Sequence, residues 1–453
     1  MSDKEKAGAG LPPPPPYYRW TVLIVASLAM AGNYYVYDAI SPLADLLRDK
    51  LGFSDDQIGT LNAIYSLPNI FMVVLGGLLI DRIGTRKATI IFGTLCFAGA
   101  LVTCLAGNFY SMATGRLIFG LGAETLIVAV TAALAKWFRG KELSLAFGLN
   151  LTVARLGSFA ALNSPTWAQP AYSDWQYPLF ISTGIGLLCI VGALAYSAME
   201  IRAEKIYSLG EADEPDKVVF RDIFRFGLSF WWVVALCVTF YSAMFPFQTF
   251  AVKFFQDVHG VSREGGGGLS SMLTFFAMIF TPLFGYLVDR VGKRSLFMMV
   301  GSALIIPVFL VMAYLPMPST GDISLGIMTL PKSGLIFPMA IMGIAFSLIP
   351  AVMWPSVAYL VDQSKLGTAL GLMTMIQNIG LAGFNKLIGW SNTVMKAGPK
   401  TPGGYAAGMW MFSVLGILGM LFALLLRRTE TGPNARGLET ITVKSQREEA
   451  ENK

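Results

Sequence analysis

Apolar and polar positions alternate along the chain in long blocks. Twelve apolar segments, each close to the length that crosses a bilayer as an α-helix, are separated by polar connections. The pattern predicts an all-α membrane protein with twelve transmembrane helices. The segments cover 20–41, 57–80, 88–107, 110–137, 143–166, 175–199, 228–254, 269–288, 295–315, 334–361, 366–390 and 404–426.

The polar stretches divide this pattern into two halves. Residues 1–19 contain a run of prolines and are expected to be a disordered cytoplasmic tail, as is the charged stretch 427–453. The charged residues 200–227 are predicted to form a cytoplasmic linker between two six-helix bundles. We therefore expect an N-terminal bundle at 20–199 and a C-terminal bundle at 228–426.

Composition agrees with a membrane protein and excludes several other classes. Of the 453 residues, 54% are hydrophobic and 14% are charged, whereas soluble domains carry about a quarter charged residues. A cytosolic enzyme, a nucleic-acid-binding module and a disordered chain are excluded, since the charges flank apolar segments. The sequence offers no nucleophile–base set, metal-ligand cluster or phosphate loop, so we expect no enzymatic activity, no metal and no cofactor.

The distribution of basic residues predicts the orientation of the chain. Most of the 34 Lys and Arg lie in the connections on the side of the two termini, which places both termini in the cytoplasm. The connections carry no glycosylation sequon and no sorting signal, so we expect a bacterial inner membrane, or a lysosomal membrane in a eukaryote. We expect a monomer, and the sequence identifies no accessory protein.

Two loop sequences occur twice, once in each predicted bundle. Residues 76–87 recur as 284–295, and residues 140–149 recur in weaker form as 364–372. Parallel six-helix repeats are the plan of transporters in which the two halves rock about a central site.

Charged residues in both copies of the loop at 76–87 and 284–295 are predicted to gate this motion. They would stabilise one conformation of the transporter through ion pairs between helix ends. The alternative is that these charges only determine which side of the membrane the loops lie on. The residues are Asp81, Arg82, Arg86, Asp289 and Arg290.

The first repeated loop resembles the cytoplasmic signature of the major facilitator superfamily. It reads Gly77-x-x-x-Asp81-Arg82-x-Gly84-x-Arg86-Lys87. The stretch from Arg116 to Gly122 is similar to the arginine–glycine motif of that superfamily, whereas the Gly-Pro motif of its antiporters is missing after Arg155. This absence counts against a drug–proton antiporter.

Further stretches resemble the branch called major facilitator superfamily domain-containing protein 1. The resemblance implies transport of dipeptides by facilitated diffusion, as a uniporter working by alternating access. The stretches are Tyr37-Asp38, Tyr65-Ser-x-Pro68-Asn69, Gly120-x-Gly-x-Glu124, Trp137-Phe-x-Gly-Lys-Glu-Leu, Ala154-Arg155-x-Gly-Ser158, Phe245-Pro246-Phe247, Trp354-Pro355 and Gln377-Asn378-x-Gly380.

Two opposite charges lie deep in consecutive apolar segments. Glu124 and Arg155 are both near the middle of their segments, where a charge costs about 2.5–3.5 kcal/mol unless it faces water or a partner. We expect both to face a central cavity and to bind a zwitterion, because Arg155 suits a carboxylate and Glu124 suits an ammonium group.

Three alternatives to this interpretation remain. The two residues could form a structural ion pair that fixes one helix against the next. The protein could carry a small organic anion such as a monocarboxylate, with Arg155 as the ligand and Glu124 as a titrating group. It could also be a non-transporting receptor on the same scaffold.

Other polar and aromatic residues within the segments complete the candidate site. They are expected to bind substrate, and the alternative for the aromatic ones is an interfacial belt or core packing. These candidates are Tyr35, Tyr37, Asp38, Tyr65, Tyr241, Trp354, Gln377 and Asn378. Arg116 is expected either to extend the polar face as a gate or to pack against backbone. The run Gly265 to Gly268 is expected to be a loose outer loop.

Overall fold

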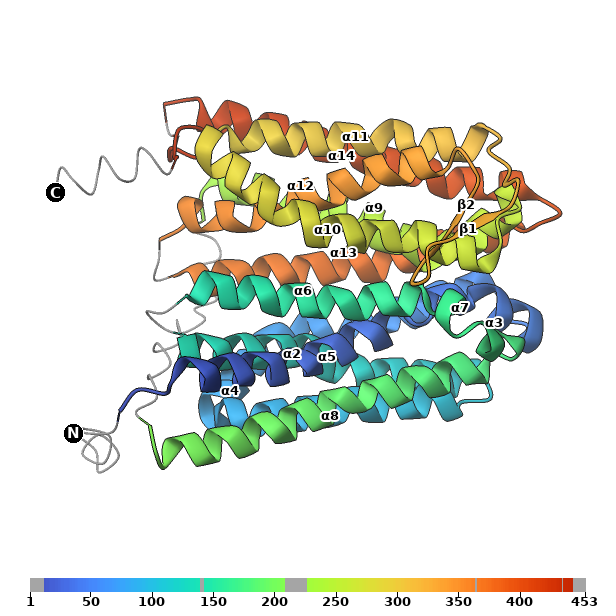
Figure 1. Ribbon diagram of the computed structural model, residues 1–453. Helices are drawn as coiled ribbons and strands as arrows, with labels where there is room; N and C mark the ends of the chain where they lie inside the picture. The colour runs from blue at the N-terminus through green and yellow to red at the C-terminus, as the bar shows by residue number, and fades with distance from the viewer. Residues whose placement is uncertain (1–11, 139–141, 208–225, 363–364, 434, 443–453) are drawn as a thin grey trace. The chain divides into compact units, whose positions relative to one another are not determined.

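The computed structural model describes residues 12–138, 142–207, 226–362, 365–433 and 435–442 (Figure 1). The side chains of Val74, Asp81 and Ser144 lie outside the described part. The described chain is almost entirely helical, which confirms the predicted all-α class. The one strand pair, β1 (Asp322–Ser324) and β2 (Thr329–Pro331), forms an antiparallel hairpin within the described residues.

The long helices coincide with the predicted apolar segments. Eleven helices of the described chain are long and apolar enough to cross a membrane. The long helices are α2 (Pro16–Asp38), α4 (Asp55–Leu105), α5 (Phe109–Phe138), α6 (Leu143–Leu162), α8 (Gln176–Glu204), α9 (Leu228–His259), α10 (Arg263–Val291), α11 (Arg294–Tyr314), α12 (Ile336–Leu360), α13 (Leu366–Val394) and α14 (Ala406–Glu430). Short helical turns between them are η1 (Ser41–Leu43), α3 (Ala44–Leu51), α7 (Ser164–Trp167), η2 (Gln169–Ser173) and η5 (Pro402–Tyr405).

The repeated loop has the same backbone feature in both copies. Helix α4 covers two predicted segments and is broken at Gly84, which has φ +79° and ψ 157°. Gly292, the equivalent residue in the second copy, follows α10 with φ +69°. A residue with a Cβ would be strained at either position, so the glycines of the repeat are needed for this turn.

Contacts along the chain divide it into two compact units. Unit 1 comprises Met1–Ala39, Leu67–Ala161 and Leu179–Pro215, and unit 2 comprises Ile40–Ser66, Leu162–Pro178 and Asp216–Lys453. Two segments of the predicted N-terminal bundle therefore belong to the same unit as the whole C-terminal bundle.

Unit 1 is held together by close helix packing and by buried polar contacts. A Cβ on Gly157 of α6 would lie 2.1 Å from the carbonyl oxygen of Ala31 in α2, so glycine is needed for this approach. The amide of Asn33 donates to the carbonyl of Ala123 in α5 at 3.1 Å. These contacts bring α2, α5 and α6 together, which are the helices that carry the candidate site of this unit.

Unit 2 contains the six helices α9 to α14, and α10, α11, α12 and α14 run side by side in it (Figure 1). In its core the ring of Phe247 packs edge to face against Phe309 and Phe412, whose own rings are tilted to each other. The same unit includes η1, α3 and α7, which contact α9 and α10.

The prediction of a loose loop at Gly265 to Gly268 is wrong. These glycines form the buried start of α10, where the hydroxyl of Ser262 caps the helix by accepting from the Gly265 N–H at 2.9 Å. A Cβ on Gly268 would lie 1.8 Å from the carbonyl oxygen of Thr329. The cap and this close contact offset the low helix propensity of glycine.

The C-terminal stretch differs from its expected description. Helix α14 extends to Glu430, and the residues that follow it include Leu438, which is completely buried. A disordered tail was expected for 427–453. The described part up to residue 442 instead contacts unit 2, and residues 443–453 lie outside the described chain.

Candidate functional site

A polar cluster in unit 1 is formed by one face of α2. Tyr34, Tyr37 and Asp38 lie three and four residues apart, which places them on the same side of the helix. The guanidinium carbon of Arg155, on α6, lies 5.6 Å from the centre of the Tyr34 ring. This distance is in the range of a cation–π interaction, so Tyr34 supports the side chain of Arg155.

Glu124 belongs to the same cluster. Its carboxylate, on α5, interacts electrostatically with the phenol groups of Tyr34 and Tyr37. Glu124 and Arg155 are each half-buried, and both make polar or electrostatic contacts. The structure thus places the predicted acid and the predicted base within electrostatic range of the same tyrosine, Tyr34.

Asp38 adds a second carboxylate to the cluster. It is buried at the end of α2, with Ser158 and Arg155 of α6 beside it and Arg116 of α5 within electrostatic range. The cluster therefore contains two acidic and two basic side chains, and its formal charge is balanced.

Arg116 is used for packing. Its guanidinium is buried and donates to the carbonyl oxygens of Val36 at 3.2 Å and Tyr37 at 3.5 Å. It also lies over the rings of Tyr37 and Phe119, at 5.8 and 5.3 Å. These contacts favour the alternative in which Arg116 bonds backbone and fixes the end of α2, and its predicted role as a gate stays a prediction.

The structure does not bring Tyr35 to this cluster. Its ring is buried in an apolar group with Ala39 and Ala161, against Ile181 and Ile185. Tyr35 follows Tyr34 directly, so it points to a different face of α2. The neighbouring Tyr34, which the sequence analysis leaves out of the site, occupies the place expected for Tyr35.

The candidates in unit 2 meet on one face of α9. The indole N–H of Trp354, on α12, donates to the hydroxyl of Tyr241 at 2.9 Å. One turn away, the thiol of Cys237 contacts the amide oxygen of Gln377, on α13, at 3.5 Å. These four residues form a shared polar and aromatic face. The substrate-binding role predicted for Tyr241, Trp354 and Gln377 stays a prediction.

Two further candidates of unit 2 are buried. The amide of Asn378 donates to the carbonyl of Thr374 in its own helix at 3.0 Å, and the ring of Tyr65 is 5% exposed. Asn378 therefore contributes to the packing of α13, and the binding roles predicted for Asn378 and Tyr65 stay predictions.

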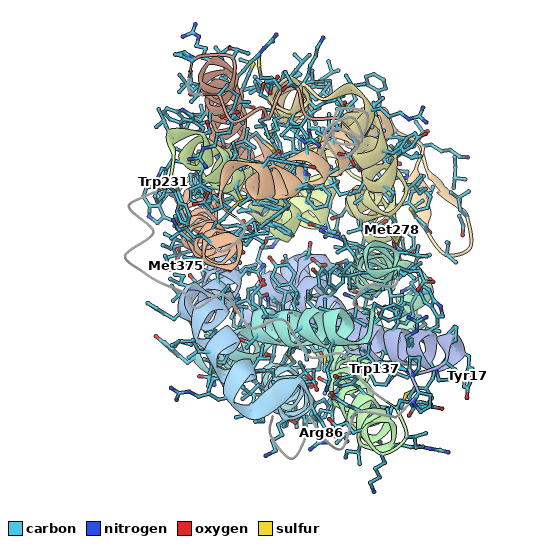
Figure 2. The ribbon with its side chains drawn as sticks, turned by 90° about the vertical axis from the view of Figure 1, so that its left-hand side faces the viewer. Tyr17, Arg86, Trp137, Trp231, Met278 and Met375 are labelled. Atoms are coloured by element: carbon cyan, nitrogen blue, oxygen red, sulfur yellow. The ribbon has the colours of Figure 1, made fainter. Side chains whose placement is uncertain are left out.

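The first copy of the repeated loop has exposed charges. Arg82 is exposed, and Arg86 pairs with Glu204 of α8 at 3.3 Å, with both side chains partly exposed. Glu204 also contacts Lys136 at 3.6 Å. Figure 2 looks onto the helix ends where Arg86 and Trp137 lie. The side chain of Asp81, predicted to gate with them, lies outside the described residues.

In the second copy the contacts are different. Asp289 pairs with Arg294 at 2.8 Å, and the side chain of Arg294 is only 2% exposed. Arg290 lies over the ring of Tyr286 at 4.4 Å. The gating role predicted for Asp289 and Arg290 is not tested by these contacts.

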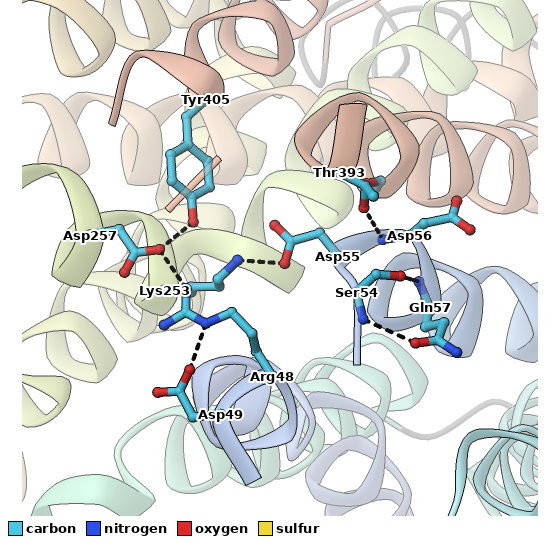
Figure 3. A network of polar contacts seen from close by, with 11 residues as sticks. Arg48, Asp49, Ser54, Asp55, Asp56, Gln57, Lys253, Asp257, Thr393 and Tyr405 are labelled. Carbon is cyan, nitrogen blue, oxygen red and sulfur yellow. Dashed lines mark hydrogen bonds and ion pairs between the residues drawn. The ribbon is translucent and has the colours of Figure 1, made fainter. Parts of the chain in front are cut away.

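A group of ion pairs, which we call the distal ion-pair cluster, lies at the end of unit 2 where α9 ends and α14 begins. Figure 3 shows two of these pairs, Lys253 with Asp55 and Arg48 with Asp257. Each pair joins a residue between α2 and the start of α4 to a residue of α9, α10 or α13. The pairs are Asp55–Lys253, Arg48–Asp257, Asp45–Arg263 and Asp56–Lys386.

The centre of this cluster is buried. The ammonium of Lys253 is fully buried against the Asp55 carboxylate and lies 5.6 Å from the Tyr405 ring. The Tyr405 hydroxyl donates to Asp257 at 2.6 Å, and Asp257 accepts from Arg48 at 3.0 Å. Buried charges of this kind need partners, so the segment between α2 and α4 is tied to the C-terminal half at this end.

Sequence reasoning missed the distal ion-pair cluster. Its residues lie in predicted loops or at segment ends, where charges are common and carry no signal. The one available signal was Lys253, which falls within the apolar segment 228–254, because a lysine inside such a segment usually has a partner.

The described residues contain no group of three or more His, Cys, Asp or Glu side chains placed to hold a metal ion.

Comparison with known proteins assigns the family. The family model of the Major Facilitator Superfamily matches residues 24–384. The chain is 31% identical over 383 residues to the lysosomal dipeptide transporter MFSD1 of Bos taurus, covering 82% of this chain and 78% of that protein. The human MFSD1 is also 31% identical over 383 residues, with coverages of 82% and 79%.

Solved structures agree with the fold. A crystal structure of the peptide transporter POT in complex with sulfate matches with a TM-score of 0.70 at 15% identity, covering 95% of this chain and 98% of that one. The nucleoside transporter NupG matches with a TM-score of 0.69 at 12% identity, with coverages of 91% and 99%. At these identities the likeness concerns the fold alone. The chain is an integral multi-pass membrane transporter that belongs to the Major Facilitator Superfamily and, within it, to the MFSD1 branch.

Proposed function

We propose that this protein transports dipeptides across a membrane by alternating access, as a uniporter. The observation that carries the proposal is the unit 1 cluster, in which Glu124 and Arg155 both interact with Tyr34. The relatives in the MFSD1 branch are named as dipeptide transporters, which supports the same substrate class.

The chemistry of the cluster matches the two ends of a dipeptide. The planar guanidinium of Arg155 can bind a carboxylate through two parallel hydrogen bonds, and the carboxylate of Glu124 can accept from an ammonium group. A dipeptide is at most about 7 Å long. Both charges act on the single side chain of Tyr34, which supports a short zwitterion as the ligand.

The charge balance of the cluster disfavours an organic anion. Arg116 already donates to two backbone carbonyls, which leaves Arg155 as the basic group for a ligand. An anion bound to Arg155 would lie near the carboxylates of both Glu124 and Asp38, and like charges repel. A zwitterion instead brings an ammonium group to those carboxylates.

We propose that the distal ion-pair cluster holds one end of the transporter closed and must separate in each transport cycle. The support is that its four pairs connect the segment between α2 and α4 with α9, α10 and α13. Asp81, Arg82 and Arg86 of the first repeated loop are proposed to act as the latch at the other helix ends, on the cytoplasmic side.

Transport of a labelled dipeptide by the purified protein in liposomes tests the proposal. We expect uptake of alanyl-alanine that is accelerated by unlabelled dipeptide on the other side and is unchanged when a proton gradient is imposed. The same peptide with an acetylated amine and an amidated carboxyl should not compete. Competition by lactate but not by dipeptides would contradict the proposal in favour of an anion carrier, and acceleration by an inward proton gradient would contradict uniport.

A further inference from the structure

The chain after α14 returns to unit 2 and binds the ends of four of its helices. Glu430, at the end of α14, is 3% exposed, and its carboxylate accepts from the Ser229 hydroxyl at the start of α9. The same carboxylate accepts from the backbone N–H groups of Arg436 at 2.9 Å and Leu438 at 3.3 Å. A buried carboxylate thus folds the chain back towards the helices.

The returning segment then binds the beginning of α11. The carboxylate of Glu439 accepts from the Ser295 N–H at 2.9 Å, and the carbonyl of Glu439 accepts from the Lys293 N–H at 2.9 Å. Lys293, the N-cap residue of α11, makes no capping hydrogen bond with its side chain. Glu439 supplies that cap from elsewhere in the chain, and a negative charge is favourable at this position.

Arg294 connects the segment to the second copy of the repeated loop. Its guanidinium donates to the Ile441 carbonyl at 2.7 Å and to Asp289 at 2.8 Å, and it lies 4.6 Å from the Tyr359 ring of α12. The side chain is 2% exposed. A buried guanidinium needs these partners, so its position depends on the segment.

Two more contacts complete the attachment. The side chain of Arg436 donates to the carbonyl of Leu360, the last residue of α12, at 2.7 Å. Leu438 is completely buried. The segment 435–441 together with Glu430 is called the C-terminal strap below, and it contacts the ends of α9, α11, α12 and α14.

The equivalent arginine of the first repeat has a different environment. Arg86 of the first copy is equivalent to Arg294 of the second copy. The side chain of Arg86 is 35% exposed, and that of its partner Glu204 is 47% exposed. Exposed pairs contribute about 0–1 kcal/mol and separate readily. The two copies of one sequence motif therefore differ in how firmly they are held.

We propose that the C-terminal strap keeps the contacts of the second copy of the repeated loop unchanged during transport, and that only the contacts of the first copy break and form again. The strap caps α11 through Glu439 and accepts from Arg294 through the Ile441 carbonyl. Arg294 in turn pairs with Asp289, so these two charges, which could form a moving latch, are already paired within unit 2. This inference rests on the proposed function in so far as its second test measures dipeptide flux.

The first test asks whether the strap is bound. A thiol-reactive maleimide should label Leu438→Cys at least ten times more slowly than Thr440→Cys, because Leu438 is buried and Thr440 is exposed in the same segment. The four native cysteines are buried and provide a low background. Adding Glu439→Gln should raise the labelling rate of Leu438→Cys several-fold. Equal rates for the two cysteines would overturn the proposal.

A measurement on the unmodified protein guards against misfolding of the cysteine variant. Hydrogen exchange of the Ser295 and Leu438 amides should be slow, since both donate to carboxylates of the strap. Exchange as fast as at the exposed chain around Ala435 would overturn the proposal.

The second test asks whether the bound strap moves. A short bifunctional thiol reagent should link Ser295→Cys to Glu439→Cys, and liposomes with the linked protein should keep the dipeptide flux of the unlinked protein within a factor of two. A loss of flux that returns on reduction of the link would show a moving latch and overturn the proposal. Absence of flux in the unlinked protein would instead count against the proposed function.

Discussion

Tyr34 and Tyr35 are neighbours in the chain, yet their side chains lie in different surroundings. Tyr34 lies against Arg155 in the polar cluster, and Tyr35 lies in an apolar group with Ala39 and Ala161. The helical spacing of Tyr34, Tyr37 and Asp38 places these three on one side of α2. At the scale of single residues, the direction of a side chain on its helix decides which candidate belongs to the site.

Replacing Tyr34 tests its role as a support for Arg155. Tyr34→Ala should weaken dipeptide binding about tenfold, because a cation–π contact is worth about 0.5–2 kcal/mol, whereas Tyr34→Phe should keep most of the affinity. Binding can be measured by calorimetry on the purified protein. Tyr35→Phe is the matched control and should leave affinity unchanged. An equal loss in Tyr34→Phe and Tyr34→Ala would contradict a role for the ring.

Ion pairs at the helix ends differ in burial, and their energetic roles should differ accordingly. Lys253 and Asp55 have side chains that are 0% and 5% exposed, whereas Lys386 and Asp56 are 50% and 28% exposed. Both pairs connect the start of α4 to helices of the C-terminal half. At the scale of elements, the buried pair fixes this connection and the exposed pair adds little to it.

Removing one partner of each pair tests this difference. Asp55→Asn should lower the unfolding temperature strongly, since an unpaired buried charge costs about 3–5 kcal/mol. Asp56→Asn should change stability by less than about 1 kcal/mol. Thermal unfolding in detergent measures both. The double variant Asp55→Asn with Lys253→Met should recover much of the loss, and a double variant as unstable as Asp55→Asn would contradict the assignment.

At the scale of the whole molecule, the sequence allowed the helices to be predicted and did not reveal which of them pack together. Long apolar blocks determine the spans almost alone, so the ends of the predicted segments match the helix ends to within six residues, apart from the two segments that share α4. The grouping of residues 40–66 and 162–178 with the C-terminal half depends on long-range contacts, such as Asp55 with Lys253. No local pattern encodes such contacts.

The candidate site, like the fold, was predictable in part. Glu124 and Arg155 stood out because charges are costly within apolar segments, and the structure brings both to Tyr34. The strap was not predictable, because residues 430–441 are polar and have no apolar period. Its order comes from individual contacts, such as those of Glu430 and Glu439.

The central claim is that Glu124 binds the amine and Arg155 binds the carboxylate of one dipeptide. Binding of alanyl-alanine, its N-acetyl form and its amide to the parent protein, Glu124→Gln and Arg155→Gln tests it most directly. Acetylation of the amine should weaken binding to the parent protein more than tenfold but hardly change binding to Glu124→Gln. Amidation of the carboxyl should likewise weaken binding to the parent protein more than tenfold but hardly change binding to Arg155→Gln. If acetylation and amidation weaken binding to both variants as much as to the parent, the assignment of the two ends is contradicted.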